Sequence, residues 1–128
     1  SYIYKRGRYY YYFGSTGTCC EGDKSTYRTV YGRSTSLLGP YVTKSGKKLL
    51  SNNYDILIKG NSRFAGTGHN AEFVEDKNGT TWILYHSFEI GKDLGRQVLL
   101  DRVLWTADGW PYCVNNEPSD CSCKPVFK

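Results

Sequence analysis

The chain has 128 residues, of which 16% are aromatic, and it contains 14 Gly. This composition favours a small β protein with many tight turns over a helical bundle. The formal net charge is only +5 and the basic residues are scattered along the chain. No nucleic-acid-binding groove is therefore expected. No apolar run approaches the roughly 18 residues of a membrane-spanning helix, so no membrane partner is expected either.

The first part of the chain predicts four strands separated by polar turns. They cover residues 2–5, 9–15, 27–34 and a last segment from 41 to about 46. A turn at Arg6-Gly7 separates the first two strands, and a turn at Gly39-Pro40 leads into the fourth. The second strand is so rich in tyrosine that we expect it to lie centrally in a sheet.

The four-strand pattern returns after an irregular stretch at residues 47–68, in which residues 56–59 are one possible strand. The strands of the second part are predicted at residues 70–76, 81–88, 97–106 and 110–114. Between the first two of them, Asn78-Gly79 is the step that two-residue hairpin turns prefer.

The two parts resemble each other at an offset of about 70 residues, as expected for a repeated structural unit. Residues 2–5 and 9–15 correspond to residues 72–75 and 82–87, and the Gly39-Pro40-Tyr41 turn corresponds to Gly109-Trp110-Pro111-Tyr112. A repeat of four antiparallel strands is typical of a β-propeller blade. Two unrelated sheets of a β-sandwich are the alternative.

The expected organisation follows from this repeat. We predict a first blade at 1–46, an irregular connection at 47–68, a second blade at 69–114 and a C-terminal tail at 115–128. Two blades alone would leave open apolar flanks. We therefore expect the partners of this chain to include further blades, either from upstream sequence or from a partner chain.

Five cysteines are present, and their spacing does not favour a zinc site. A disulfide from Cys113 to Cys121 or Cys123 would fix the tail and would fit an exported protein. The adjacent pair Cys19 and Cys20 could be two thiols or a vicinal disulfide, and the sequence leaves both possibilities open.

Three groups of motifs, in this order, resemble glycoside hydrolase family 43, and most closely its arabinanase and arabinofuranosidase branch. The first group is the aromatic strand 9–15, Cys19-Cys20-Glu21-Gly22, Ser25-Thr26-Tyr27, Tyr31-Gly32-Arg33-Ser34, Leu38-Gly39-Pro40-Tyr41 and Lys44-Ser45-Gly46. The second is Gly66-Thr67-Gly68-His69-Asn70-Ala71. The third is residues 82–86, Leu100-Asp101-Arg102, Trp105 and Asp108-Gly109-Trp110-Pro111.

The resemblance implies an all-β fold, about two four-stranded blades of a five-bladed β-propeller. It implies an inverting hydrolase acting on α-L-arabinofuranosyl linkages of arabinan or related polysaccharides, in a secreted, periplasmic or cell-surface microbial protein. Inverting enzymes use an acid and a base about 6.5–9.5 Å apart. When this chain is aligned with the family, the general acid Glu is expected just before Ser1. The base and an auxiliary Asp are expected further upstream. No catalytic residue is then expected within this chain, which alone should be inactive.

Substrate contacts within the chain are expected at His69 and at the loop with Cys19, Cys20 and Glu21, which borders the sugar cleft in the family. In the resembling arabinanases the corresponding histidine contacts a hydrated ion, often calcium. His69 is therefore the candidate metal contact, directly or through water, although calcium prefers oxygen ligands.

Other carboxylates have structural interpretations. Glu75 and Asp76 flank a hairpin and are expected to be solvated. Glu72 is expected to form an ion pair at the surface. Asp101 is expected to form a local ion pair or a contact between blades. Trp110 is expected to pack between the blades. Phe13, Tyr85 and His86 lie on central strands, where packing in the core is the default.

Two alternatives stay open from the sequence. One is a propeller that has lost its acid and serves only to bind carbohydrate or protein. The other is a hydrolase of xylan or arabinoxylan, since the sequence leaves the substrate open. Endo and exo action also stay open, because that choice is expected to depend on loops of the other blades.

Overall fold

The computed structural model describes residues 1–120 and 124–127, which contain nine β-strands and three short 3-10 helices. The strands are β1 (Tyr2–Arg6), β2 (Tyr9–Thr16), β3 (Arg28–Ser34), β4 (Asp55–Ile58), β5 (Phe64–Gly68), β6 (Val74–Glu75), β7 (Thr81–Glu89), β8 (Arg96–Trp105) and β9 (Pro111–Tyr112). The 3-10 helices are η1 (Gly22–Lys24), η2 (Leu49–Ser51) and η3 (Val114–Asn116). The all-β prediction is confirmed. Within the described residues, no helix has the length and apolarity needed to cross a membrane.

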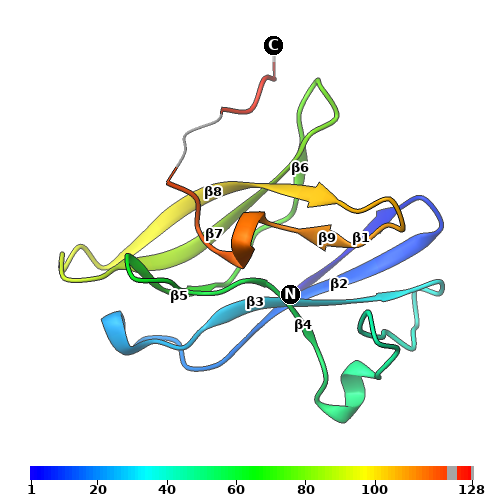
Figure 1. Cartoon of the computed structure of the whole chain (residues 1–128), viewed down its shortest axis with the longest axis horizontal. Helices are drawn as coiled ribbons and strands as arrows, with labels where there is room; N and C mark the ends of the chain where they lie inside the picture. The colour runs from blue at the N-terminus through cyan, green and yellow to red at the C-terminus, as the bar shows by residue number, and fades with distance from the viewer. Residues whose placement is uncertain (121–123, 128) are drawn as a thin grey trace.

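The strands form two antiparallel meanders, one of β1–β4 and one of β5–β9 (Figure 1). In the first, β1, β2, β3 and β4 pair in chain order. In the second, β5 and β6 both pair with β7, which pairs with β8, and β8 pairs with β9. One parallel bridge, between Arg28 of β3 and Thr67 of β5, joins the two meanders. We call them the first and the second blade.

The repeat inferred from the sequence has a counterpart in the pairing. The β1–β2 hairpin corresponds to the β6–β7 hairpin. At the far edge, Val42 pairs with Arg33 of β3 as Pro111 of β9 pairs with Trp105 of β8. The Gly39-Pro40 turn, with its cis peptide bond, and the Gly109-Trp110 turn therefore lead the chain back along the third strand of each blade.

Three strand predictions differ from the structure. The segment expected at 41–46 is reduced to isolated bridges of Val42, because the chain turns away at η2 before returning as β4. The stretch 47–68, expected to be irregular apart from residues 56–59, contains both β4 and β5. The sequence of β5 is Phe-Ala-Gly-Thr-Gly, which has low strand propensity, and its extended form depends on pairing with β7.

The strand expected at 70–76 is only the two residues of β6. His69 has a left-handed backbone with φ of 53°, which interrupts the first strand of the second blade between β5 and β6. The segment still follows β7, since the Ala71 amide donates to the Leu84 carbonyl oxygen over 2.8 Å.

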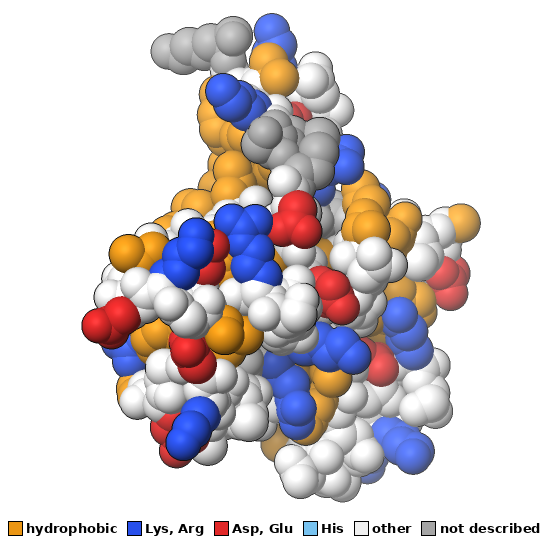
Figure 2. Space-filling view, turned by 60° about the vertical axis from the view of Figure 1, so that its left-hand side comes forward, with side chains coloured by type: hydrophobic (Ala, Val, Ile, Leu, Met, Phe, Trp, Pro, Cys, Tyr) orange, Lys and Arg blue, Asp and Glu red, His pale blue; other side chains and the backbone are white. Residues whose placement is uncertain are grey.

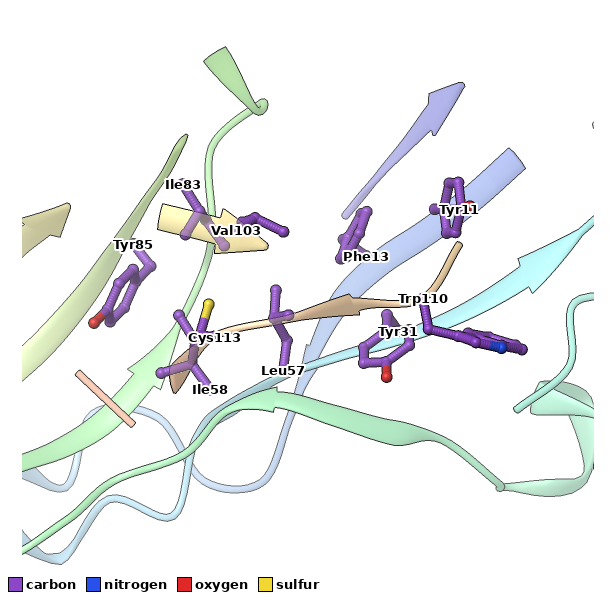
Figure 3. Close-up of a cluster of buried hydrophobic side chains, with 10 residues drawn as sticks. All are labelled: Tyr11, Phe13, Tyr31, Leu57, Ile58, Ile83, Tyr85, Val103, Trp110 and Cys113. Carbon is purple, nitrogen blue, oxygen red and sulfur yellow. The ribbon is translucent and has the colours of Figure 1, made fainter. Parts of the chain in front are cut away.

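The hydrophobic core lies between the two blades (Figure 3). The first blade contributes Tyr11, Phe13, Tyr31, Leu57 and Ile58, and the second blade with its C-terminal extension contributes Ile83, Tyr85, Val103, Trp110 and Cys113. Full burial of one such apolar side chain stabilises the fold by about 1.5–3 kcal/mol. As expected, Phe13 and Tyr85 are core residues, and Trp110 packs across the blades against Tyr31, with ring centroids 6.3 Å apart.

The outer surface of each blade exposes large apolar side chains. Leu38 is 95% exposed and Leu50 is 97% exposed in the first blade, and Val98 is 66% exposed in the second. Charges are mixed: Figure 2 shows Lys and Arg side chains interspersed with Asp and Glu on the face that it draws.

Candidate functional site

The loop between β2 and β3 is closed at its base by hydrogen bonds between Thr18 and the residues at its far end. The Thr18 amide donates to the Thr26 hydroxyl oxygen over 2.9 Å, and the Tyr27 amide donates to the Thr18 carbonyl oxygen over 2.9 Å. Cys19 and Cys20 follow directly and are exposed, and Cys20 has a left-handed backbone with φ of 70°. The loop therefore presents both thiols at the surface.

His69 is positioned by the end of β5. Its backbone amide donates to the Ser15 hydroxyl oxygen of the first blade over 2.8 Å. Before it, Gly68 lies against the ring of Tyr27, so that a Cβ atom on Gly68 would come within 2.2 Å of that ring. Only glycine fits at this position, and the close approach brings Tyr27, the residue before β3, next to the residue that precedes His69.

These elements enclose a pocket between the two blades. It is lined by Cys19, Cys20, Tyr27, Gly66, His69, His86, Phe88 and Arg96. The imidazole rings of His69 and His86 are 5.1 Å apart between centroids and inclined by 60°. The turn between β7 and β8 is held to the cysteine loop, because the Gly91 amide donates to an Asp23 carboxylate oxygen over 2.9 Å.

Arg96 is the permanent charge of the pocket. Its Nη2 donates to the Cys20 Sγ over 2.7 Å, and that sulfur lies 2.7 Å from the Cys19 Sγ. The contact with Cys20 raises the pKa of the Cys19 thiol above its ordinary value, and the charge of Arg96 offsets only part of that rise. Cation, imidazoles and aromatic rings together suit a polar ligand with apolar C–H faces.

The structure brings three of the four predicted site residues together. His69, Cys19 and Cys20 line the pocket, whereas Glu21 does not; its backbone amide donates to the Ser25 hydroxyl oxygen. His86, expected in the core, lines the pocket because alternation along β7 turns it away from the neighbouring core residue Tyr85. That alternation is the signal that could have identified it.

Tyr27, Phe88 and Arg96 line the same pocket and were not among the candidate site residues. Arg96 lies 76 positions after Cys20 in the sequence. No local pattern could therefore connect the two. Their meeting depends on how the β7–β8 hairpin lies against the cysteine loop.

No Asp or Glu lines this pocket within the described part of the chain. Asp101 is buried and accepts hydrogen bonds from the Tyr85 hydroxyl over 2.5 Å and from the Ser119 amide. Among the described residues, these local hydrogen bonds stand in place of the expected local ion pair or contact between blades. Glu72 and Glu75 are exposed.

Asp76 corrects another expectation, because it is buried rather than solvated. Its carboxylate accepts hydrogen bonds from Trp82 Nε1 over 3.0 Å and from the amides of Asn78, Thr80 and Val126. Burial alone would raise the pKa of Asp76, but these donors lower it below its ordinary value. The residue holds the hairpin and the tail together.

A calcium site is not formed by these residues alone. Across residues 1–120 and 124–127, no three or more His, Cys, Asp or Glu side chains are arranged to hold a metal ion. Calcium takes about six to eight oxygen ligands, and the imidazole of His69 offers only nitrogen. A calcium contact of His69 therefore stays a prediction that would need ligands from outside these residues.

The expected disulfide of the tail falls partly outside the structure. Cys113 is 2% exposed and carries a free thiol, and burial raises its pKa strongly. Its predicted partners, Cys121 and Cys123, lie outside the described residues.

Comparison with known proteins places this geometry in a family. Residues 1–111 match the model of glycosyl hydrolases family 43. The chain is 36% identical over 110 residues to an extracellular exo-alpha-(1->5)-L-arabinofuranosidase of Cellvibrio japonicus, which covers 86% of this chain and 31% of that protein. It is also 36% identical over 108 residues to an extracellular endo-alpha-(1->5)-L-arabinanase of Bacillus subtilis, which covers 84% of this chain and 31% of that protein.

A solved structure agrees with the fold. The alpha-L-arabinanase of Cellvibrio cellulosa in complex with arabinohexaose superposes with a TM-score of 0.80 at 36% identity, over 87% of this chain and 35% of the other. The two blades are accordingly part of a five-bladed propeller. The chain spans about a third of the length of the relatives it matches. It belongs to glycosyl hydrolases family 43.

Proposed function

We propose that this chain is part of an inverting hydrolase of α-L-arabinofuranosyl linkages in arabinan or related plant polysaccharides, and that it supplies one wall of the sugar cleft. The observation that carries the proposal is a pocket of sugar-binding character, without a carboxylate among its lining residues, in a chain of family 43. Support for the substrate comes from the names of relatives that act on arabinan.

The chemistry divides between this chain and residues outside it. Inversion needs one carboxylic acid to protonate the leaving oxygen and one carboxylate to activate water, about 6.5–9.5 Å apart. The pocket itself has donors instead: the Arg96 guanidinium and the imidazoles of His69 and His86. We propose that these groups bind and orient sugar hydroxyls, while Tyr27 and Phe88 offer apolar ring surface to the C–H face of a sugar.

The 128-residue chain alone is then expected to release no reducing sugar from linear arabinan. Hydrolysis by the purified chain would overturn the assignment of the carboxylates to residues outside it. It would leave the family and the pocket untouched.

Binding tests the wall itself. In an NMR titration with arabinohexaose, the ring signals of His69 and His86 should shift, and His86→Ala should weaken the binding about tenfold, as expected for loss of a well-placed polar contact. Arg102→Gln is the matched control, since Arg102 is exposed on β8 and is not part of this pocket. Equal binding of xylohexaose would redirect the proposal to xylan or arabinoxylan. If neither sugar binds, the proposal that this pocket forms one wall of a sugar cleft is wrong.

Secretion is part of the same proposal. Two relatives carry the word extracellular in their names. A polysaccharide such as arabinan has to be cleaved outside the cell before its fragments can be imported. Detection of the protein in culture medium rather than in the cell extract is the expected result.

A further inference from the structure

The two adjacent cysteines form a pair that the proposed hydrolysis does not use. Cys19 and Cys20 are both exposed, and their sulfur atoms are in contact at 2.7 Å. We propose that they form a reactive dithiol, which closes to a vicinal disulfide by exchange with a low-molecular-weight disulfide such as oxidised glutathione. This chemistry is independent of any sugar substrate.

Within the described residues, the pair has no competing thiol nearby. Cys113 is buried in the core between the blades, away from solvent and from any small oxidant. Thiol exchange requires access of the attacking sulfur to the disulfide. Exposure therefore selects Cys19 and Cys20 over Cys113.

The backbone at the pair already departs from an ordinary loop. Cys20 has φ of 70°, a conformation that residues other than Gly adopt uncommonly. Consecutive Cα atoms are about 3.8 Å apart, whereas the Cα atoms of ordinary disulfides are about 4.4–6.8 Å apart. A bond between neighbours is therefore expected to be easily reduced, and strained, exposed disulfides are the labile ones.

Arg96 selects the sulfur that reacts first. Its guanidinium donates to Cys20 Sγ over 2.7 Å, so that this sulfur, unlike that of Cys19, lies directly against a cation. The Cys20 thiolate attacks one sulfur of oxidised glutathione, which forms a mixed disulfide and releases one glutathione thiolate. Cys19 then gives its proton to water and attacks the Cys20 sulfur, which releases the second glutathione thiolate.

The electrons balance in this exchange. The two protein thiols lose two electrons and two protons, and the small disulfide gains the two electrons. The product has no thiolate to accept from Arg96. Closure therefore frees the guanidinium within the pocket that it shares with His69 and His86.

Peptide mapping of the complete 128-residue chain tests the product. Trypsin cleaves after Arg8 and Lys24, so residues 9–24 form one peptide with both cysteines. After treatment with oxidised glutathione, acid quenching and alkylation, we expect this peptide to be lighter by two hydrogen atoms and to accept no alkyl group until dithiothreitol is added. Two alkylated cysteines, a lasting glutathione adduct, or a link to Cys113, Cys121 or Cys123 would each overturn the proposal.

Variants test the order of events. Cys19→Ser should trap glutathione on Cys20, because the resolving thiol is gone. Arg96→Gln should slow closure about three- to tenfold, as expected for loss of one exposed charge-assisted contact. Arg102→Gln, on the same strand and outside the pocket, should leave the rate unchanged. A glutathione-free Cys19→Ser chain, or equal rates for Arg96→Gln and the unaltered chain, would contradict this order.

Discussion

The first hairpins of the two blades have the same place in the repeat and opposite chemistry. At the β1–β2 turn the charges are exposed and lie over rings: Arg6 is 4.4 Å from the centroid of Trp105 and Arg8 is 4.9 Å from that of Tyr9. At the β6–β7 turn the charge of Asp76 is buried and is satisfied by one indole and three backbone amides.

The difference shows which property of a blade repeats. The backbone pairing and the buried aromatic positions on the second strand are common to both blades, whereas the polar contacts at the turn differ between them. A turn with exposed charge needs no specific acceptor, because water solvates it. A buried carboxylate must find donors, since an unpaired buried charge is costly. The second hairpin should therefore be the more sensitive to substitution.

The largest expected effect lies in the core that the blades share. Phe13 is fully buried, and its ring centroid is 4.3 Å from that of Phe73 of the second blade. Phe13→Ala should lower the free energy of unfolding by about 3–5 kcal/mol, because it leaves a cavity in the core. Urea denaturation, followed by circular dichroism and by tryptophan fluorescence, measures the loss.

All three tryptophans belong to the second blade, so their fluorescence reports on its unfolding. If the blades unfold as one unit, Phe13→Ala shifts both signals together. A shift of the circular dichroism alone would show that the second blade unfolds independently. Leu38→Ala is the control, and it should have little effect because Leu38 is 95% exposed.

A smaller loss is expected for Asp76→Asn, since the neutral amide is a weaker acceptor for the same donors. The pKa of Asp76 is lowered by folding, so its contribution to stability is present above the ordinary value of 3.8 and is lost as the pH falls through the lowered value. Acidification from about pH 6 to about pH 3 should therefore cost the unaltered chain more stability than the variant.

The urea midpoint at both pH values measures this difference, with Glu75→Gln as the exposed neighbouring control. A pH dependence that is the same in Asp76→Asn and in the unaltered chain would mean that other carboxylates dominate acid unfolding.

The smallest effects concern arginines of the first blade. Arg33 lies between the rings of Tyr9 and Trp110, at 3.8 Å and 3.7 Å from their centroids, and donates to the Asp108 carbonyl oxygen of the second blade over 2.8 Å. Arg33→Lys should cost about 1 kcal/mol, because an ammonium group cannot stack on two rings and bond a carbonyl at once.

Arg8→Ala is the comparison for Arg33→Lys. Arg8 is itself exposed and lies over only one ring, the half-buried ring of Tyr9, and its removal should change the unfolding free energy by less than about 0.5 kcal/mol. Thermal or urea unfolding of both variants ranks them. A larger loss for Arg8→Ala than for Arg33→Lys would reverse the view that contacts between the blades, rather than the exposed turn, hold the first blade.

Much of the fold follows from local patterns in the sequence. The alternation and the aromatic content of β2, β3, β7 and β8 determine long strands, and the Asn78-Gly79 step determines a hairpin, because these preferences act between near neighbours. The same is true of the repeat and of His69 with Cys19 and Cys20 as candidates, since the motifs that point to them are contiguous.

Other features of the fold and the pocket depend on contacts between segments that are distant in the sequence, and only the tertiary structure decided them. β5 is a strand because β7 pairs with it, Asp76 is buried because Trp82 and Val126 surround it, and Arg96 reaches Cys20 only when the β7–β8 hairpin lies over the cysteine loop. Burial and long-range pairing carry no local signature in the chain. The sequence therefore determined the long strands and the three predicted pocket residues Cys19, Cys20 and His69, and the packing of one blade on the other determined the rest.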